Sequence, residues 1–330
     1  MNLLTVIMPV YNGELYLEEA INSILNQTFT DFKLLVLNDN STDSTPRILE
    51  AYQKKDSRVE VITKTKNEGP ANLRNEGIER SQTEFIALMD ADDVSLPTRF
   101  EKQLEVLNNN PNIGVCGTWF SFFGDKQKLI KHAVEPEALK VQFLSSCGVG
   151  NPTVMFRASA IKDFRFEHQY VPAEDYGLWS EVIQITDFYN IPESLLNYRW
   201  HPNNISQTKA ENLRKADALI KKRQLLHFGI DDSKATLDNY LNAVSLSRKL
   251  SPEQIISAIE ASKELKARNK KTNYYQPTIF ETHINTVIVR TIRNASAYNK
   301  TFYNYLKNES GYFTQIPFID KLLILLKSLF

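Results

Sequence analysis

Cysteine is scarce in this sequence, and neither sign of charge is in excess. Two cysteines, Cys116 and Cys147, occur in 330 residues. That is too few for a disulfide framework or a sulfur-rich zinc site, so we expect two buried, reduced thiols. The 39 basic residues balance 39 acidic ones. Because a general nucleic-acid binder carries a basic excess, that class of protein is disfavoured, and only local charged patches remain open.

Long apolar runs are missing as well. No stretch approaches the roughly 18–20 apolar residues of a membrane-spanning helix. Residues 1–9 lack the basic start of a signal peptide and are typical of a strand instead. We therefore expect a cytoplasmic protein. At roughly 100–200 residues per domain, the length predicts about two domains.

The first hundred residues alternate between short apolar runs and helical patterns. Strands are predicted at 3–10, 32–37, 59–63 and 85–89, and helices at 15–25, from 44 onward, and at 71–81. Ser44 and Pro46 occupy cap and first-turn positions of the second helix. Strands that are apolar throughout and separated by helices are typical of a parallel sheet covered on both faces.

The pattern changes after residue 100. It predicts a helix to about 110, one or two strands in 113–123, a strand after the loop at 148, a helix after 172–175, and short strands at 188–191 and 195–200. From about residue 209 the sequence is helical and more charged. This part is expected to form a second region.

Polar residues collect where the first four predicted strands end. In open parallel sheets, ligands bind beyond the carboxyl ends of the strands. The residues at those ends are Pro9, Tyr11, Asn12, Asn38, Asp39, Asp43, Asn67, Gly69, Arg74, Asp90, Asp92 and Asp93. The sequence therefore predicts a binding site at this edge of the sheet.

Asp90-Ala91-Asp92-Asp93 is the most acidic part of that edge. Three carboxylates within four residues repel one another unless a cation lies between them. Mg²⁺ and Mn²⁺ prefer oxygen ligands and commonly use one or two carboxylates together with substrate phosphates. The alternative is a solvated acidic turn in which Asp93 caps a helix. The position beside Asp39 favours the metal site.

Five segments resemble the signature blocks of glycosyltransferase family 2, in the family's order over residues 3 to about 206. They are Val6-Ile7-Met8-Pro9-Val10-Tyr11-Asn12, Leu37-Asn38-Asp39-Asn40-Ser41-Thr42-Asp43, Asp90-Ala91-Asp92-Asp93, Glu174-Asp175-Tyr176-Gly177-Leu178-Trp179 and Tyr198-Arg199-Trp200-His201. The resemblance implies an α/β GT-A fold, a doubly wound and mostly parallel sheet, followed by a smaller helical region. The expected domains are 1–208, with a donor half 1–100 and an acceptor half 101–208, and a mainly α-helical region 209–330.

The resemblance also implies roles for individual residues. Pro9 and Tyr11 would line the nucleobase pocket, and Asp39 would accept a hydrogen bond from the base, as in uridine-specific relatives. The family's common Asp-Asp pair is Asn38-Asp39 in this chain. Asp92 would be the main metal ligand. The residues expected at the donor nucleotide are Pro9, Tyr11, Asn12, Asp39, Arg74, Asp90 and Arg199.

Glu174-Asp175 resembles the family's catalytic pair. Transfer to a hydroxyl needs a carboxylate that takes its proton; the family pattern assigns this to Asp175, with Glu174 supporting it or contacting the acceptor. The alternative is an ordinary acidic helix N-terminus. Arg199 would hold the leaving diphosphate in two-point contacts. His201 would bind metal or phosphate, or be structural, and 151–153 would line the sugar or acceptor pocket.

Residues 316–330 place large apolar side chains on one helical face. Two interpretations stay open: a terminal helix docked on the catalytic domain, or an interfacial helix on a membrane surface. The second suits a lipid-linked acceptor and peripheral residence at the inner face of the cell membrane. Five basic residues in 263–271 would help such contact or form a solvated face.

The predicted function is an inverting glycosyltransferase that uses Mn²⁺ or Mg²⁺. It would move a hexosyl or N-acetylhexosaminyl group from a nucleoside-diphosphate donor, with UDP expected from Asp39, to a saccharide or lipid-linked saccharide in bacterial cell-surface polysaccharide or glycolipid synthesis. No nucleic-acid partner is expected. A nucleotidyltransferase is the main alternative, but the first strand is followed only by Tyr11-Asn12-Gly13 rather than a Gly-rich phosphate loop with a basic residue. The other alternative is a non-catalytic nucleotide-sugar-binding module. A dinucleotide-binding domain of this kind is disfavoured because no Gly-x-Gly-x-x-Gly follows any predicted strand.

Overall fold

The computed structural model describes residues 3–201, 210–231, 235–244 and 249–329. Two compact units divide the chain. Unit 1 comprises Met1–Lys140 and Cys147–Asp217, and unit 2 comprises Val141–Ser146 and Ala218–Phe330. The predicted boundary at 208–209 lies outside the described residues, so it stays a prediction.

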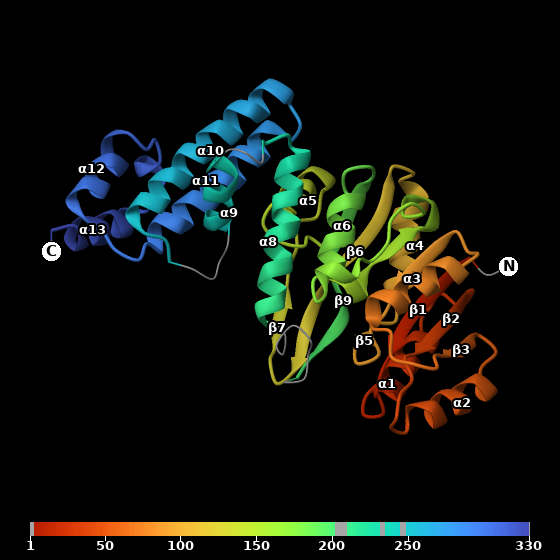
Figure 1. Cartoon of the computed structure of the whole chain (residues 1–330). Coiled ribbons are helices and arrows are strands. Elements are labelled where there is room, and N and C mark those ends of the chain that lie inside the picture. The colour runs from red at the N-terminus through yellow and green to blue at the C-terminus, as the bar shows by residue number, and fades with distance from the viewer. Residues whose placement is uncertain (1–2, 202–209, 232–234, 245–248, 330) are drawn as a thin grey trace. The chain divides into compact units, whose positions relative to one another are not determined.

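A nine-stranded sheet forms the centre of the described part of unit 1 (Figure 1). Its first four strands run parallel, in the order β3 (Val59–Thr63), β2 (Phe32–Asn38), β1 (Leu4–Val10) and β4 (Phe85–Leu88). The order continues with β8 (Met155–Arg157), β6 (Ile113–Gly124), β9 (Asp187–Trp200) and β5 (Val94–Ser95), and β7 (Lys128–Ile130) pairs with β6. β8 is antiparallel to both neighbours, whereas β6 and β9 are parallel. The predicted α/β fold is confirmed. The sheet is mixed rather than mostly parallel, because β8, β5 and β7 run antiparallel to their neighbours.

Helices cover both faces of the parallel strands. One core cluster joins Val6 and Met8 of β1 to α1 (Leu17–Leu25), α2 (Thr45–Lys55) and α4 (Arg99–Asn109). Ile7 points to the opposite face, because side chains alternate along a strand, and meets α3 (Pro70–Arg80) there. A Cβ built on Gly77 of α3 would lie 2.7 Å from Ile7 Cγ2. Glycine therefore lets α3 lie close against β1. α5 (Pro136–Gln142) and α6 (Glu174–Val182) complete the main helices up to residue 201.

Several local predictions need correction. The two short strands expected at 188–191 and 195–200 form one strand, β9, because the register jumps from Ile191 to Ser194 and a bulge absorbs Pro192 and Glu193. Ser44 is in the cap position of α2, but its side chain makes no capping hydrogen bond; Asp43 Oδ1 accepts from the Thr45 N–H instead.

The expectations for the two thiols and for Asp93 are also revised in part. Both cysteines are free; Cys116 is buried, as expected, whereas Cys147 is only half-buried. Asp93 caps no helix, because α4 begins at Arg99 with Thr98 in the cap position. The helix cap that the alternative interpretation assigned to Asp93 is therefore wrong.

Unit 2 is helical in its described part, as predicted for the C-terminal region. Its helices are α9 (Ala235–Val244), α10 (Pro252–Thr272), α11 (Pro277–Arg293), α12 (Lys300–Asn308) and α13 (Phe318–Lys327), and α8 (Ala210–His227) leads into it. They bury a core of their own that includes Tyr240, Ile259 and Ile288. Within the described ranges, no helix is both long and apolar enough to cross a bilayer.

Candidate active site

The loops after β1 and β2 are joined by hydrogen bonds at the carboxyl ends of the strands. The Asn12 N–H donates to Ser41 Oγ at 2.9 Å, and the Thr42 N–H donates to Asn12 Oδ1 at 2.8 Å. Asn12 has a φ of 49°, a left-handed conformation that asparagine tolerates better than most residues. Its amide thus shapes the loop, while the neighbouring Tyr11 ring stays 53% exposed. An exposed ring on a fixed loop can stack on a flat base.

Asp39 connects the same edge to the loop before α3. Its side chain is buried, and its two carboxylate oxygens accept from the backbone N–H groups of Glu68 at 2.7 Å and Gly69 at 2.8 Å. A carboxylate has about four acceptor positions, so two remain after these bonds. The two backbone bonds therefore fix Asp39, and one acceptor position on each carboxylate oxygen is left for a further donor.

Arg74 links the acidic loop to the helix that carries the expected base. Its guanidinium donates to Asp90 Oδ1 at 2.8 Å and to Glu174 Oε1 at 3.0 Å. Burial lowers the pKa of Arg74, but the charges of Asp90 and Glu174 outweigh that effect and raise it. Glu174 is 100 residues away from Arg74 in the sequence, and Asp90 is 16 residues away. The fold brings both carboxylates to the buried guanidinium group of Arg74.

The acidic loop itself is short of positive charge. Asp93 is 1% exposed; its Oδ1 accepts the Arg199 N–H at 2.9 Å, while its buried Oδ2 has no hydrogen-bond partner. Burial, followed by the charges of Asp92 and Asp90, raises the pKa of Asp93 well above its ordinary value. Burial and the charge of Asp90 also raise the pKa of Asp92, against the opposing effect of His201.

His201 meets Asp92 at this loop. Their Nε2 and Oδ2 atoms are 3.2 Å apart, although 109 residues separate them in sequence. Arg199 lies beside them, but its guanidinium pairs with Glu19 and donates through Nε to the Asp92 carbonyl at 2.8 Å. Its planar group also lies 4.2 Å from the Tyr16 ring centroid and 4.3 Å from that of Phe123. In this structure Arg199 therefore supports the acidic loop.

Asp175 follows Glu174 at the start of α6. Burial raises the pKa of Asp175 to about 6, the charge of Glu174 adds to that rise, and Arg74 opposes it. A carboxyl group with a pKa near neutrality is suited to accepting a proton at the pH of a cell. The side chain is half-buried, so it retains access to solvent. The chemistry available here is proton transfer beside a strongly anionic loop.

The sequence pattern of the family "Glycosyl transferase family 2" matches residues 5–165. An uncharacterized glycosyltransferase of Haemophilus influenzae is 31% identical over 246 residues, which cover 69% of this chain and 76% of the relative. The chain belongs to glycosyltransferase family 2. As a member of that family it is a glycosyltransferase.

Other relatives of this glycosyltransferase have more specific names. The Escherichia coli protein "UDP-Glc:alpha-D-GlcNAc-diphosphoundecaprenol beta-1,3-glucosyltransferase WfgD" is 29% identical over 216 residues, 64% of this chain and 83% of that one. Among solved structures, S. aureus TarS 1-349 in complex with UDP has a TM-score of 0.59 at 20% identity, over 91% of this chain and 93% of that chain. The structural similarity shows a shared GT-A fold.

The residues of the glycosyltransferase that could hold a divalent cation are Asp92 and His201. In the described part of the chain, no group of three or more His, Cys, Asp or Glu side chains is arranged to hold a metal. Two protein ligands still fit Mg²⁺ or Mn²⁺, which commonly complete their coordination with substrate phosphates and water. The buried Asp93 Oδ2 has no hydrogen-bond partner, and burial and the charge of Asp90 raise the pKa of Asp92, so a cation at this point would favour the ionised carboxylates. The donor set therefore fits a cation.

Arg99 is a buried residue next to this site that the sequence analysis did not identify. It is fully buried and donates to the carbonyls of Leu88 at 3.0 Å and Pro152 at 2.6 Å. Burial lowers its pKa to about 9, and the charge of Asp93 opposes that shift. Arg99 thus joins the end of β4, which precedes the acidic loop, to the segment at 151–153. At the start of an amphipathic helix, an arginine is normally expected to be exposed, which is why pattern analysis missed it.

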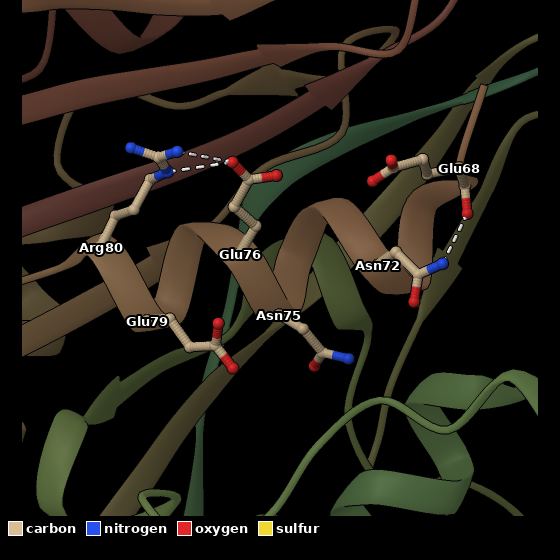
Figure 2. A pocket seen from close by; sticks show the side chains of 6 residues that line it. All are labelled: Glu68, Asn72, Asn75, Glu76, Glu79 and Arg80. Carbon is tan, nitrogen blue, oxygen red and sulfur yellow. Dashed lines mark hydrogen bonds and ion pairs between the residues drawn. The ribbon is translucent and has the colours of Figure 1, made fainter. Parts of the chain in front are cut away.

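A shallow depression also lies along the outer side of α3 (Figure 2). Its lining is polar and partly paired, with Arg80 bonded to Glu76 and the Asn72 amide bonded to the Glu68 carbonyl. None of the predicted catalytic, nucleotide or metal residues lines it. The candidate active site therefore remains the edge that carries Asp39, Arg74, the acidic loop and Asp175.

Proposed function

We propose that this glycosyltransferase moves a hexosyl or N-acetylhexosaminyl group from a UDP-sugar to a hydroxyl of a saccharide or lipid-linked saccharide, with inversion at the anomeric carbon. The product would belong to a bacterial cell-surface polysaccharide or glycolipid. The observation that carries the proposal is the convergence of the Asp92–His201 pair, the Arg74 bridge and Asp175 at one edge of the sheet. The name of the E. coli relative and the UDP complex of TarS support the donor and acceptor classes.

The proposed donor site uses the loops after β1 and β2. Tyr11 offers an exposed ring beside Pro9 and Asn12, and Asp39 offers a fixed acceptor with free capacity. Uracil presents an N3–H donor that matches this acceptor, whereas guanine needs a set of partners that Asp39 alone does not supply. A uridine nucleotide is therefore the proposed donor, with thymidine next.

Asp92 and His201 would hold Mn²⁺ or Mg²⁺ with the donor diphosphate. A bound divalent cation there would neutralise the charge that develops on the leaving diphosphate. Asp90 faces Arg74, so it is proposed to orient the loop and approach the ribose or sugar. The predicted contact of Arg199 with the diphosphate would require its guanidinium to turn away from Glu19.

Asp175 is the proposed general base. As the acceptor oxygen forms its bond to the anomeric carbon, the bond from that carbon to the diphosphate oxygen breaks, and the hydroxyl proton passes to the Asp175 carboxylate. Glu174 is held by Arg74 at 3.0 Å, which suits a residue that positions α6 and tunes its neighbour. With a pKa of about 6, Asp175 is largely ionised above pH 7 and ready to accept the proton.

The location of the acceptor bears on where the enzyme works. A lipid-linked saccharide would keep a cytoplasmic enzyme at the inner face of the cell membrane, and peripheral contact through 316–330 is part of this proposal. The division into catalytic residues 1–208, with donor half 1–100 and acceptor half 101–208, and helical residues 209–330 is also retained as a proposal.

Thermal shift across nucleotide sugars tests the function directly. A true donor raises the melting temperature by mass action, so UDP-sugars with Mn²⁺ should stabilise the protein more than GDP- or dTDP-sugars at equal concentration. Stabilisation by GDP-sugars alone would overturn the uridine assignment. A nucleotidyltransferase would instead release pyrophosphate from UTP and a sugar 1-phosphate, and we expect no such release.

A further inference from the structure

α13 of unit 2 exposes its apolar side chains. Ile324 of α13 and the preceding Ile316 are each 2% exposed and join the core of unit 2. Six other large apolar residues are between 45% and 73% exposed. We call them the 318–329 face: Phe318, Ile319, Leu322, Leu323, Leu326 and Leu329. A helix on a soluble surface normally buries its apolar stripe and exposes its polar side. In α13 most of the large apolar side chains are on the exposed side instead.

Helical geometry places the face in one continuous sector. At about 100° per residue, the five of its side chains that belong to α13 fall within about 140° of arc, and Leu329 follows just beyond the helix end. Lys321 lies beyond one edge of that sector and Lys327 beyond the other. The Lys321 ammonium is 5.2 Å from the Phe313 ring centroid, and that of Lys327 is 5.4 Å from the Tyr298 ring centroid. A wide apolar stripe between two flanking lysines is typical of helices that lie at a membrane surface.

Charge is divided unequally between the two units. Residues 141–146 and 218–330, which form unit 2, contain 17 of the 39 basic and 9 of the 39 acidic residues. Unit 1 has the other 22 basic and 30 acidic residues. The neutral chain therefore combines a unit of net charge −8 with one of +8. A basic unit is attracted to anionic lipid headgroups, whereas a second copy of unit 2 would repel it.

We propose that unit 2 docks on an anionic bilayer, with α13 lying flat among the headgroups, its 318–329 face toward the acyl chains and Lys321 and Lys327 at the phosphates. The ten residues of α13 measure about 15 Å, too short to span a bilayer. The inference specifies the proposed membrane contact. It rests on the proposed function only for the lipid-linked acceptor that would require such a contact, because the apolar face and the charge of unit 2 do not depend on the reaction.

The test is sedimentation of the full-length protein with vesicles of phosphatidylcholine alone or mixed with phosphatidylglycerol. Wild type should bind the anionic vesicles, and less so at high salt. The double variant Leu322→Glu/Leu326→Glu should lose more than about tenfold in partitioning, since two large side chains leave the apolar phase. Both positions are exposed, so the fold should survive. Lys321→Gln/Lys327→Gln should lose less and show weaker salt dependence.

A matched control is Ile185→Glu, an equally drastic change at a 62% exposed position of unit 1, which should bind vesicles as wild type does. UDP-sugar hydrolysis in the absence of lipid should be unchanged in every variant, so failure of the docking proposal is distinguishable from failure of the proposed function. Absence of vesicle binding, equal binding to neutral vesicles, or a concentration-dependent dimer abolished by Leu322→Glu/Leu326→Glu would overturn the proposal.

Discussion

Replacing Glu174 by glutamine should move the acidic side of the pH–rate profile to lower pH. The charge of Glu174 raises the pKa of Asp175, which stands at about 6. At an effective dielectric constant of about 20, two like unit charges roughly 6–10 Å apart repel by about 2 kcal/mol, which corresponds to about 1.5 pKa units. Arg74, 3.0 Å from Glu174, compensates part of that charge. We therefore expect the pKa to fall by about one unit in Glu174→Gln.

The assay is kcat/KM against pH, because its pH dependence reports the pKa of the free enzyme. At pH 6 the wild type should have about half of its maximal kcat/KM and Glu174→Gln about nine-tenths, with similar values near pH 8 where Asp175 is ionised in both. Glu181→Gln, a charge change on the same helix but well away from Asp175 in sequence, should leave the profile in place. If the midpoint of the acidic limb is unchanged or moves to higher pH in Glu174→Gln, the assignment of that limb to the ionisation of Asp175 is refuted.

Three further changes test other parts of the account. Asp92→Asn should weaken Mn²⁺-dependent UDP binding by more than about tenfold in titration calorimetry, because even outer partners of metal sites matter that much; normal binding would remove Asp92 from the metal site. UDP should bind more tightly than GDP. Asp39→Asn should reduce the ratio of the two dissociation constants by about tenfold, since the substitution removes the charge from the proposed hydrogen bond to the base. Gly77→Ala should cost about 1–2 kcal/mol in urea unfolding, because the new Cβ would lie 2.7 Å from Ile7 Cγ2 and overpacking outweighs the gain in helix propensity. An unchanged urea midpoint would show that α3 can shift away from β1.

Local sequence patterns predicted the strands of the first hundred residues closely. The expected strand at 59–63 is β3 to the residue, and the run at 32–37 is β2 with one residue added. β1 and β2 are buried along most of their length, so their apolar runs are easy to recognise, whereas most of β3 is only half-buried. The bulge at Pro192 was missed because proline normally ends a strand, whereas here the pairing continues on both sides of it.

The candidate site was predictable only where residues share a loop or a family block. Asp90, Asp92 and Asp93 stand together in the sequence, but the contact of Asp92 with His201 spans 109 residues and was not predicted. The pairing of Arg74 with Glu174, and of Arg199 with Glu19, depends on how three layers pack. No local pattern encodes such contacts. The burial of Arg99 was hidden for the same reason.

The tail shows a different limit of sequence analysis. Its apolar face was visible from the residues, but not which side of the helix faces the protein. Since Ile316 and Ile324 belong to the core of unit 2, deleting 316–330 would remove core residues together with the exposed face. Point substitutions on the 318–329 face therefore separate the two roles more cleanly than a truncation does.

The central claim is that Asp175 removes the acceptor proton at a site that holds a UDP-sugar. The most direct measurement is single-turnover sugar transfer by Asp175→Asn, with UDP-sugar affinity measured on the same preparation. Asparagine is nearly isosteric but cannot take the proton, so we predict unchanged donor affinity and a rate lower by about 10²–10⁴-fold. A variant that binds the donor and transfers sugar at the wild-type rate would contradict the account and move the base elsewhere, with Glu174 the next residue to test.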